Sequence, residues 1–105
     1  MAKNVDKKVI KAVEKYIAEI RKHYNIKDAF LFGSFAQGTQ HDCSDIDVAI
    51  ILDKIQNKFD EMVKLYKYTR GIDARIEPHP IMSIEFNRKN DPLVNEVLRT
   101  GIKII

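Results

Sequence analysis

Apolar residues recur every three or four positions in three segments of the chain, with charged residues between them. Such spacing places the apolar side chains along one face of a helix. We therefore predict helices from Asn4 to Tyr24, from Lys58 to Arg70, and from Asp91 to the residue before Gly101. In the second of these helices, the side chains expected to face inward are Phe59, Met62, Val63, Tyr66 and Thr69.

The last predicted helix has a distinct start at Asp91-Pro92. An Asp side chain accepts hydrogen bonds from the free N–H groups of a first helical turn, and proline at the first helical position has no N–H to leave unpaired. Beyond Gly101, the short apolar tail from Ile102 to Ile105 is a candidate last strand. The apolar face of this helix is expected to consist of Leu93, Val94, Val97 and Leu98.

Strands are predicted in three places. Ala29 to Phe32 is apolar throughout, and Asp45 to Leu52 is nearly so after its two carboxylates, as is typical of strands buried on both faces. Ile72 to Met82 alternates apolar and polar residues at first, which indicates a strand with one buried face. Pro78 and Pro80 cannot donate ladder hydrogen bonds, so this strand must end there or lie at the edge of a sheet.

The predicted elements follow one another as helix, strand, helical turn, strand, helix, strand and helix, with the helical turn at Phe35 to Gly38. This order predicts one domain over residues 1–105, of the α+β or α/β class, in which helices back a small sheet. The composition, 45% hydrophobic and 31% charged, is ordinary for a globular protein.

Charge and hydropathy exclude some classes of partner. The net charge is only +3, and the basic residues are interspersed with Asp and Glu, so the sequence shows no nucleic-acid-binding footprint. No apolar run approaches the roughly 20 residues that span a membrane, and the N-terminal segment lacks the apolar core of a secretory signal. The single Cys43 cannot form an internal disulfide. We therefore expect a cytoplasmic protein with no membrane partner.

Two carboxylates, Asp45 and Asp47, stand at the start of the second predicted strand. Side chains at i and i+2 of a strand point to the same face, so these two are expected to lie a few ångströms apart. Like charges held so close favour a divalent cation, and Mg²⁺ is typically bound by one or two carboxylates together with substrate phosphates. The pair therefore indicates a magnesium site.

Gly33-Ser34 directly follows the first predicted strand. Glycine permits a tight turn and a close approach of a ligand to the backbone. If a helix begins there, its free N–H groups and the Ser34 hydroxyl form a site suited to phosphate. Together with the carboxylate pair, this turn indicates a substrate that carries a polyphosphate and Mg²⁺.

A third carboxylate would complete such a site and accept the proton of an attacking hydroxyl. Asp73 and Glu77 are the candidates, four residues apart on one face of the predicted strand. We favour Glu77, because the Pro-His-Pro that follows it holds the strand end in position. Arg75, between them, either forms a salt bridge with a carboxylate or contacts a phosphate, and we favour the salt bridge. For His79 we favour a structural hydrogen bond over a role as ligand or base.

These residues carry a resemblance to a known superfamily. Gly33-Ser34, then ten residues, then Asp45-Ile46-Asp47 resembles the GS-x10-DxD signature of the DNA polymerase beta-like nucleotidyltransferases. The short chain resembles in particular the minimal nucleotidyltransferases that act as antitoxins of HEPN/MNT toxin–antitoxin pairs. One departure is Gln37, where the family commonly has Arg. A glutamine amide can donate hydrogen bonds to a phosphate but brings no positive charge.

The resemblance implies a fold and an activity. The implied fold is an α+β domain with a small mixed β-sheet backed by helices. The implied reaction is Mg²⁺-dependent transfer of the nucleotidyl group of ATP to a tyrosine hydroxyl of a HEPN toxin, which would silence the toxin. In this family the third acidic residue follows an apolar residue on a later strand, which both Ile72-Asp73 and Ile76-Glu77 match.

The resemblance also implies roles for the site residues. Asp45 and Asp47 would bind the metal together with Glu77, and Glu77 or Asp73 would act as the third carboxylate. Two other functions remain open. One alternative is an antitoxin that neutralises its partner by binding alone, with a vestigial catalytic site. The other, transfer to a small molecule, is disfavoured because no second domain exists to bind it. The residues expected to contact the nucleotide phosphates are Gly33, Ser34, Gln37 and Arg75.

Overall fold

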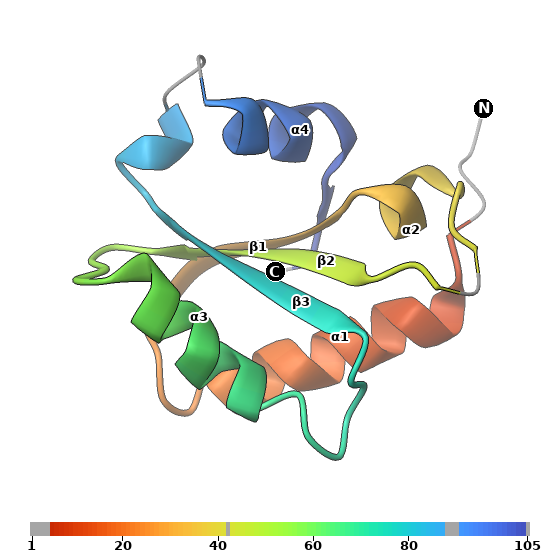
Figure 1. The fold of residues 1–105 in the computed structure, drawn as a ribbon, viewed down its shortest axis with the longest axis horizontal. Coiled ribbons are helices and arrows are strands. Elements are labelled where there is room, and N and C mark those ends of the chain that lie inside the picture. The colour runs from red at the N-terminus through yellow and green to blue at the C-terminus, as the bar shows by residue number, and fades with distance from the viewer. Residues whose placement is uncertain (1–4, 42, 88–90, 105) are drawn as a thin grey trace.

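The computed structural model describes residues 5–41, 43–87 and 91–104 (Figure 1). Asn4 and Ile105, the predicted start of the first helix and end of the tail, lie outside these residues. The elements are α1 (Lys7–Ile20), β1 (Ile26–Phe32), α2 (Ser34–Gln37), β2 (Ile46–Leu52), α3 (Lys58–Lys67), β3 (Ile76–Met82), the 3-10 helix η1 (Glu85–Asn87), α4 (Pro92–Thr100) and β4 (Ile102–Lys103).

The strands form one mixed four-stranded sheet in the order β3-β2-β1-β4. β1 pairs antiparallel with both β2 and β4, whereas β2 pairs parallel with β3. α1 and α3 lie on one side of the sheet and α4 lies on the other (Figure 1). The predicted α+β class, with a small mixed sheet backed by helices, is confirmed.

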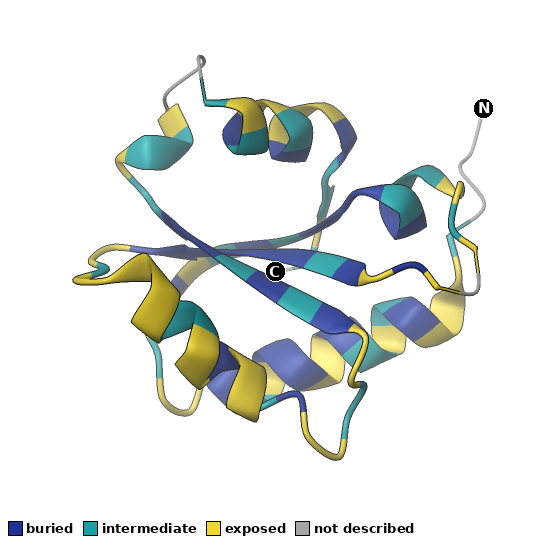
Figure 2. Cartoon of the chain, in the orientation of Figure 1, coloured by how far each residue is buried: buried dark blue, intermediate teal, exposed yellow. Residues whose placement is uncertain are grey.

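The core lies in two apolar layers, one on each face of the sheet. Alternate residues of β2 serve the two layers, with Val48 and Ile50 facing α1 and with Ala49 and Ile51 facing α4. β2 is therefore buried on both faces, as its nearly continuous apolar sequence predicts (Figure 2). None of the helices in the described part of the chain has the length and apolar character needed to cross a membrane.

α1 is shorter than the apolar spacing predicts. It begins at Lys7 because the Asp6 side chain accepts from the N–H of Lys8, which caps the first turn. It ends at Ile20, whose carbonyl accepts from the N–H groups of both His23 and Tyr24, 2.9 Å from each, in a tight turn that follows the helix. Periodicity alone cannot distinguish this turn from a further helical turn.

The prediction for the inward face of α3 is largely wrong. Leu65 is the buried residue of this helix, and its carbonyl accepts a hydrogen bond of 2.8 Å from the Tyr16 hydroxyl of α1. Phe59 is 68% exposed, and Val63 and Tyr66 are also exposed, whereas Met62 is half-buried. α3 packs against β3, the edge strand of the sheet, and most of its surface is exposed (Figure 2). Its apolar positions therefore do not all reach the core. Thr69 is buried as predicted but lies in the turn after the helix.

The strand predicted from Ile72 is also corrected, because β3 begins at Ile76. Residues 72–75 form a turn in which the Asp73 carbonyl accepts from the N–H of Ile76, 3.2 Å away. The alternation of apolar and polar residues in this turn resembles that of a strand by coincidence. Pro78 and Pro80 lie within β3, which is an edge strand as the prolines require.

The C-terminal predictions are mostly confirmed. Oδ1 of Asp91 accepts from the N–H groups of Leu93 and Val94, and Pro92 occupies the first position of α4. The tail pairs with β1 as β4 and so closes one edge of the sheet. Leu98 is an exception, because it is exposed rather than part of the buried face of α4.

Candidate active site

The end of β1 and the starts of β2 and β3 meet on one face of the sheet. Phe32 of β1 is paired with Asp47 of β2, and Asp47 is paired with Glu77 of β3. Residues in register on neighbouring strands present their side chains to the same face. The sheet therefore places the Asp47 and Glu77 carboxylates side by side.

His79 joins these two carboxylates, because it stands two residues after Glu77 and shares its face of β3. Its Nε2 atom lies 3.1 Å from Oδ1 of Asp47, at hydrogen-bond distance. One ligand atom from each of Asp47, Glu77 and His79 lies within 4.8 Å of the others. We call these three residues the β2–β3 cluster. Oxygen and imidazole donors at such separations suit a divalent cation.

Asp45 lies just before β2 and is exposed. It does not belong to the β2–β3 cluster, but its charge acts on Glu77. Burial raises the pKa of the Glu77 carboxyl above its usual range, nearby His79 opposes this rise, and the negative charges of Asp47 and Asp45 add to it. Burial and the charges of Glu77, Asp45 and Asp47 likewise raise the pKa of Tyr66 on α3. Asp45, Asp47 and Glu77 thus form one concentration of negative charge.

Gly33 lies against the Asp47 carboxylate and directly precedes α2. Its φ is 77°, and a Cβ placed on it would stand 2.6 Å from Oδ2 of Asp47. α2 runs from Ser34 to Gln37, one residue earlier at each end than the helical turn predicted at Phe35 to Gly38. The N–H groups of a first helical turn have no partner within the helix, so they are available to an anion. Gln37 is the last residue of α2 and is half-buried.

Asp73 and Arg75 pair with one another. Nε and Nη2 of the Arg75 guanidinium donate to the two oxygens of Asp73, at 3.1 Å and 2.8 Å. This hydrogen bonding lowers the pKa of the Asp73 carboxyl, although burial opposes the shift. The guanidinium also lies over the ring of Phe35, 5.5 Å from its centroid. The favoured salt bridge of Arg75 is therefore present, and it is Glu77 rather than Asp73 that contributes to the β2–β3 cluster.

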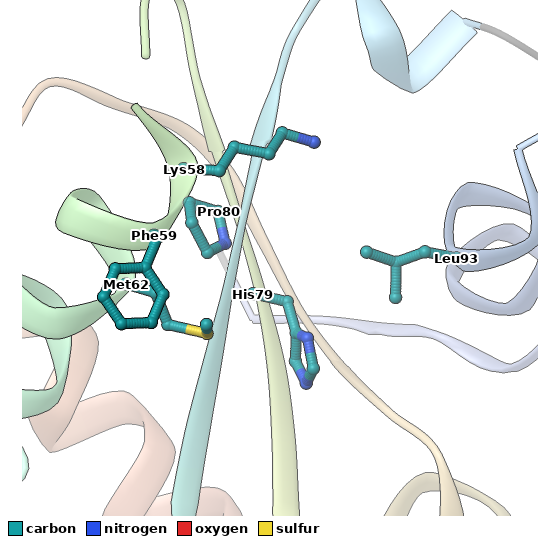
Figure 3. Close-up of a pocket in the computed structure, with 6 residues that line it drawn as sticks. All are labelled: Lys58, Phe59, Met62, His79, Pro80 and Leu93. Atoms are coloured by element: carbon teal, nitrogen blue, oxygen red, sulfur yellow. The ribbon is translucent and has the colours of Figure 1, made fainter. Parts of the chain in front are cut away.

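An apolar groove of about 250 Å³ opens beside the cluster (Figure 3). Phe59 and Met62 of α3 lie on one side of β3, and Leu93 of α4 lies on the other. The groove reaches the cluster through His79, which lines it and contacts Asp47. The hydrogen bond favoured for His79 from the sequence is present, and its partner is Asp47. The position of His79 two residues after Glu77 on a strand is the signal that places it on the same face.

The arrangement combines three features that suit a phosphorylated substrate. Asp47, Glu77 and His79 offer cation ligands, and the absence of a Cβ at Gly33 lets the Asp47 carboxylate lie against the backbone that leads into α2. The first turn of α2 offers N–H groups to an anion next to that cation site. A divalent cation and a polyphosphate are therefore compatible with the residues present.

Comparison with known proteins supports the same class. Residues 14–105 match the family model described as Polymerase beta, Nucleotidyltransferase. No curated protein sequence matches the chain. A protein from Sulfolobus solfataricus, assigned as a nucleotidyltransferase, has a similar structure with a TM-score of 0.65 and 20% sequence identity over 97% of this chain and 90% of that one.

Two structures of toxin–antitoxin complexes are also similar. One, described as a toxin–antitoxin with AMP-PNP, has a TM-score of 0.67 and 24% identity over 88% of this chain and 72% of that one. The other, a mutant of the toxin–antitoxin MntA-HpeT, has a TM-score of 0.63 and 22% identity with the same coverage. At these identities the likeness shows a shared fold.

Proposed function

Because the chain belongs to the polymerase beta nucleotidyltransferase family, we propose that it transfers a nucleotidyl group from a nucleoside triphosphate to a hydroxyl, and that Asp45, Asp47 and Glu77 carry the reaction. The observation that supports these roles best is the pairing of Asp47 with Glu77 beside the backbone of Gly33. It brings carboxylates and the start of α2 to one place.

In the proposed reaction, the acceptor oxygen attacks the α-phosphorus of the triphosphate and forms a new P–O bond. The bond from the α-phosphorus to the oxygen that bridges to the β-phosphate breaks, and pyrophosphate leaves with that electron pair. Glu77 accepts the proton of the hydroxyl. Its raised pKa suits this role, because a carboxylate of higher pKa is a stronger base.

Asp45 and Asp47, with Glu77, would hold Mg²⁺ or a similar divalent cation. Such an ion, when bound, neutralises negative charge on the phosphates and on the leaving pyrophosphate. The three neighbouring carboxylates support this assignment, because in the absence of a cation burial and the charges of Asp47 and Asp45 raise the pKa of Glu77.

The start of α2 would hold the phosphates. Gly33 allows the turn into α2 with its φ of 77°, and the Ser34 hydroxyl and the first N–H groups of α2 provide donors. Gln37 provides an amide and no charge. In this proposal Arg75 binds a phosphate only if its guanidinium releases Asp73 and pairs with the phosphate instead.

We propose ATP as the donor and a hydroxyl of a HEPN-type toxin as the acceptor. The fold is shared with toxin–antitoxin structures, one of which is described with AMP-PNP, an ATP analogue. Adenylylation of the partner would then neutralise it.

Intact mass spectrometry tests this proposal. The protein is incubated with ATP, Mg²⁺ and the product of the neighbouring gene, and a gain of adenylyl mass on that product is expected. The variant with both Asp45→Asn and Asp47→Asn should give no mass gain, while its circular dichroism spectrum remains that of the wild type. Retained transfer in this variant would reject the assigned carboxylates.

A second function is neutralisation by binding alone. It is favoured because the candidate phosphate contacts offer little positive charge: Gln37 is uncharged, and the Arg75 guanidinium is already paired with Asp73. The same double variant separates the two functions in cells. If it still protects cells from the toxin, binding suffices; if protection is lost while the complex still forms, transfer is required.

A further inference from the structure

His79 differs from the other groups of the site because it brings nitrogen to a set of carboxylates. Its side chain is only 22% exposed, and its Nε2 atom is directed at Oδ1 of Asp47. The protein contains three histidines. The other two contact different groups: the ring of His23 stacks on Tyr68, and Nδ1 of His41 accepts from the N–H of Cys43.

The position of the His79 ring is constrained by its surroundings. Pro78 and Pro80 flank it in β3 and are both buried, and a proline ring restricts the backbone on either side. The imidazole also packs edge-on against the ring of Phe32, with 5.2 Å between the ring centroids. A ligand that is held in place before an ion arrives loses little conformational entropy on binding.

The separation of the His79 and Asp47 donor atoms fits two neighbouring ligands of one ion, and Glu77 lies near them. Adjacent ligands of an octahedral cation, each about 2.1 Å from it, lie about 3 Å apart. Nε2 of His79 and Oδ1 of Asp47 are 3.1 Å apart, and a ligand atom of Glu77 lies within 4.8 Å of both. The contact that serves as a hydrogen bond between His79 and Asp47 therefore also has the geometry of two neighbouring ligands.

We propose that His79 is a direct ligand of the divalent cation and joins the carboxylates proposed above, so that Asp47, Glu77 and His79, with Asp45, form a mixed oxygen–nitrogen site that prefers Mn²⁺ or Co²⁺ to Mg²⁺. Mg²⁺ favours oxygen ligands and retains its water, whereas imidazole is a good ligand for first-row transition ions. The neutral imidazole binds through the lone pair of Nε2. This inference rests on the metal-binding part of the proposed function and specifies which ions that site selects.

The first test uses Mn²⁺ alone, whose electron spin reports directly bound nuclei. The protein is produced with ¹⁵N-labelled histidine, loaded with Mn²⁺, and examined by electron spin-echo envelope modulation. We expect a ¹⁵N coupling from a directly bound imidazole. It should vanish in His79→Gln and persist in His23→Gln, the matched control at an exposed histidine.

The second test is the ratio of affinities. Binding of Mn²⁺ is followed by the loss of the free-ion electron paramagnetic resonance signal, and Mg²⁺ and Co²⁺ are measured by competition. We expect His79→Gln to lower the preference for Mn²⁺ over Mg²⁺ by about 10-fold, as is typical when a group that tunes a metal site is removed. The ratio should not change in His23→Gln.

The outcomes separate this inference from the proposed function. Bound Mn²⁺ without histidine coupling, or an unchanged ratio in His79→Gln, would overturn the inference even if nucleotidyl transfer is observed. No binding of any of the three ions would also overturn it. Histidine coupling in a protein that transfers no nucleotide would support the inference and reject the proposed function. If His79→Gln does not fold, the coupling in the wild-type protein still decides.

Discussion

The backbone of Gly33 lies directly against the carboxylate of Asp47, so that a Cβ at position 33 would stand 2.6 Å from Oδ2. The two residues belong to the end of β1 and the start of β2, neighbouring antiparallel strands in which Phe32 is paired with Asp47. A positive φ of 77° adds a second requirement for glycine at this position. The turn that begins α2 and the acidic site are thus held together by one close contact.

Gly33→Ala should damage both stability and activity. The added methyl group must displace the Asp47 carboxylate, and alanine at φ 77° and ψ −152°, a region that is essentially restricted to glycine, costs about 1–3 kcal/mol by itself. We expect the free energy of unfolding, measured with urea, to fall by about 2–3 kcal/mol. Nucleotidyl transfer should fall by about 100-fold, because displacement of a catalytic group by about 1 Å has an effect of that size.

Gly71→Ala is the matched control for this substitution. Gly71 also has a positive φ, 79°, but among the described residues no atom outside its chain neighbours lies within 4 Å of the position that its Cβ would take. This variant should lose about 1 kcal/mol of stability and retain its activity. Equal losses of activity in the two variants would mean that the contact between Gly33 and Asp47 has no special effect.

Glu77→Gln and Asp73→Asn should separate the two candidates for the third carboxylate. Glu77 belongs to the β2–β3 cluster, whereas Asp73 is paired with Arg75. Loss of a proton acceptor typically lowers kcat by about 10²–10⁴-fold, and we expect this for Glu77→Gln. Asp73→Asn should leave kcat within about 3-fold of the wild type, since its role is structural. The reverse result would assign the role to Asp73.

The raised pKa of Glu77 predicts how the stability of the protein depends on pH. A carboxyl whose pKa is higher in the folded chain than its ordinary value of 4.5 favours folding when it is protonated. That stability is fully present below pH 4.5 and is lost as the pH rises through the folded pKa. The groups that set this pKa besides burial are His79, Asp47 and Asp45.

Glu77→Gln should therefore be more stable than the wild type at pH 7 and equally stable at pH 3.5. Urea unfolding in the presence of a chelator, at both pH values, measures the difference. The chelator is needed because a bound cation would stabilise the wild-type carboxylate. A variant that is less stable than the wild type at pH 7 would show that the charged Glu77 is favourable in the folded chain.

Tyr16→Phe should destabilise the protein without affecting the site. The Tyr16 hydroxyl of α1 donates a buried hydrogen bond of 2.8 Å to the Leu65 carbonyl of α3, and burial raises the pKa of this tyrosine. A lost hydrogen bond of this kind costs about 1 kcal/mol, and we expect that decrease in the free energy of unfolding. Activity should match the wild type, and unchanged stability would show that the hydroxyl does not help to hold α3 against α1.

Local signals in the sequence predicted several features well. Asp91-Pro92 predicts the start of α4 because the cap is formed by the side chain next to the helix. The prolines of β3 predict an edge strand because they lack the N–H that an inner strand needs. The Gly33-Ser34 turn predicts the start of α2 for a similarly local reason. In each case the cause lies within a few residues of its effect.

Features that depend on distant partners were predicted less well. The apolar residues of α3 gave no indication that Leu65 would be its buried residue, because this depends on how the helix lies beside α1 and the sheet. The alternation after Ile72 favoured a strand, but the side chain of Asp73 accepts from the N–H of Arg75 and holds a turn. Periodicity describes a segment and not the surface against which it packs.

The sequence by itself determined the class of fold, the family resemblance and the carboxylates Asp45 and Asp47 as candidate ligands, because these follow from residue type and short spacing. Only the tertiary structure decided that Glu77 and His79, rather than Asp73, stand beside Asp47. The reason is physical: β2 and β3 are parallel strands brought together by a long connection, and their register, which aligns residue 47 with residue 77, is set by packing across the whole sheet.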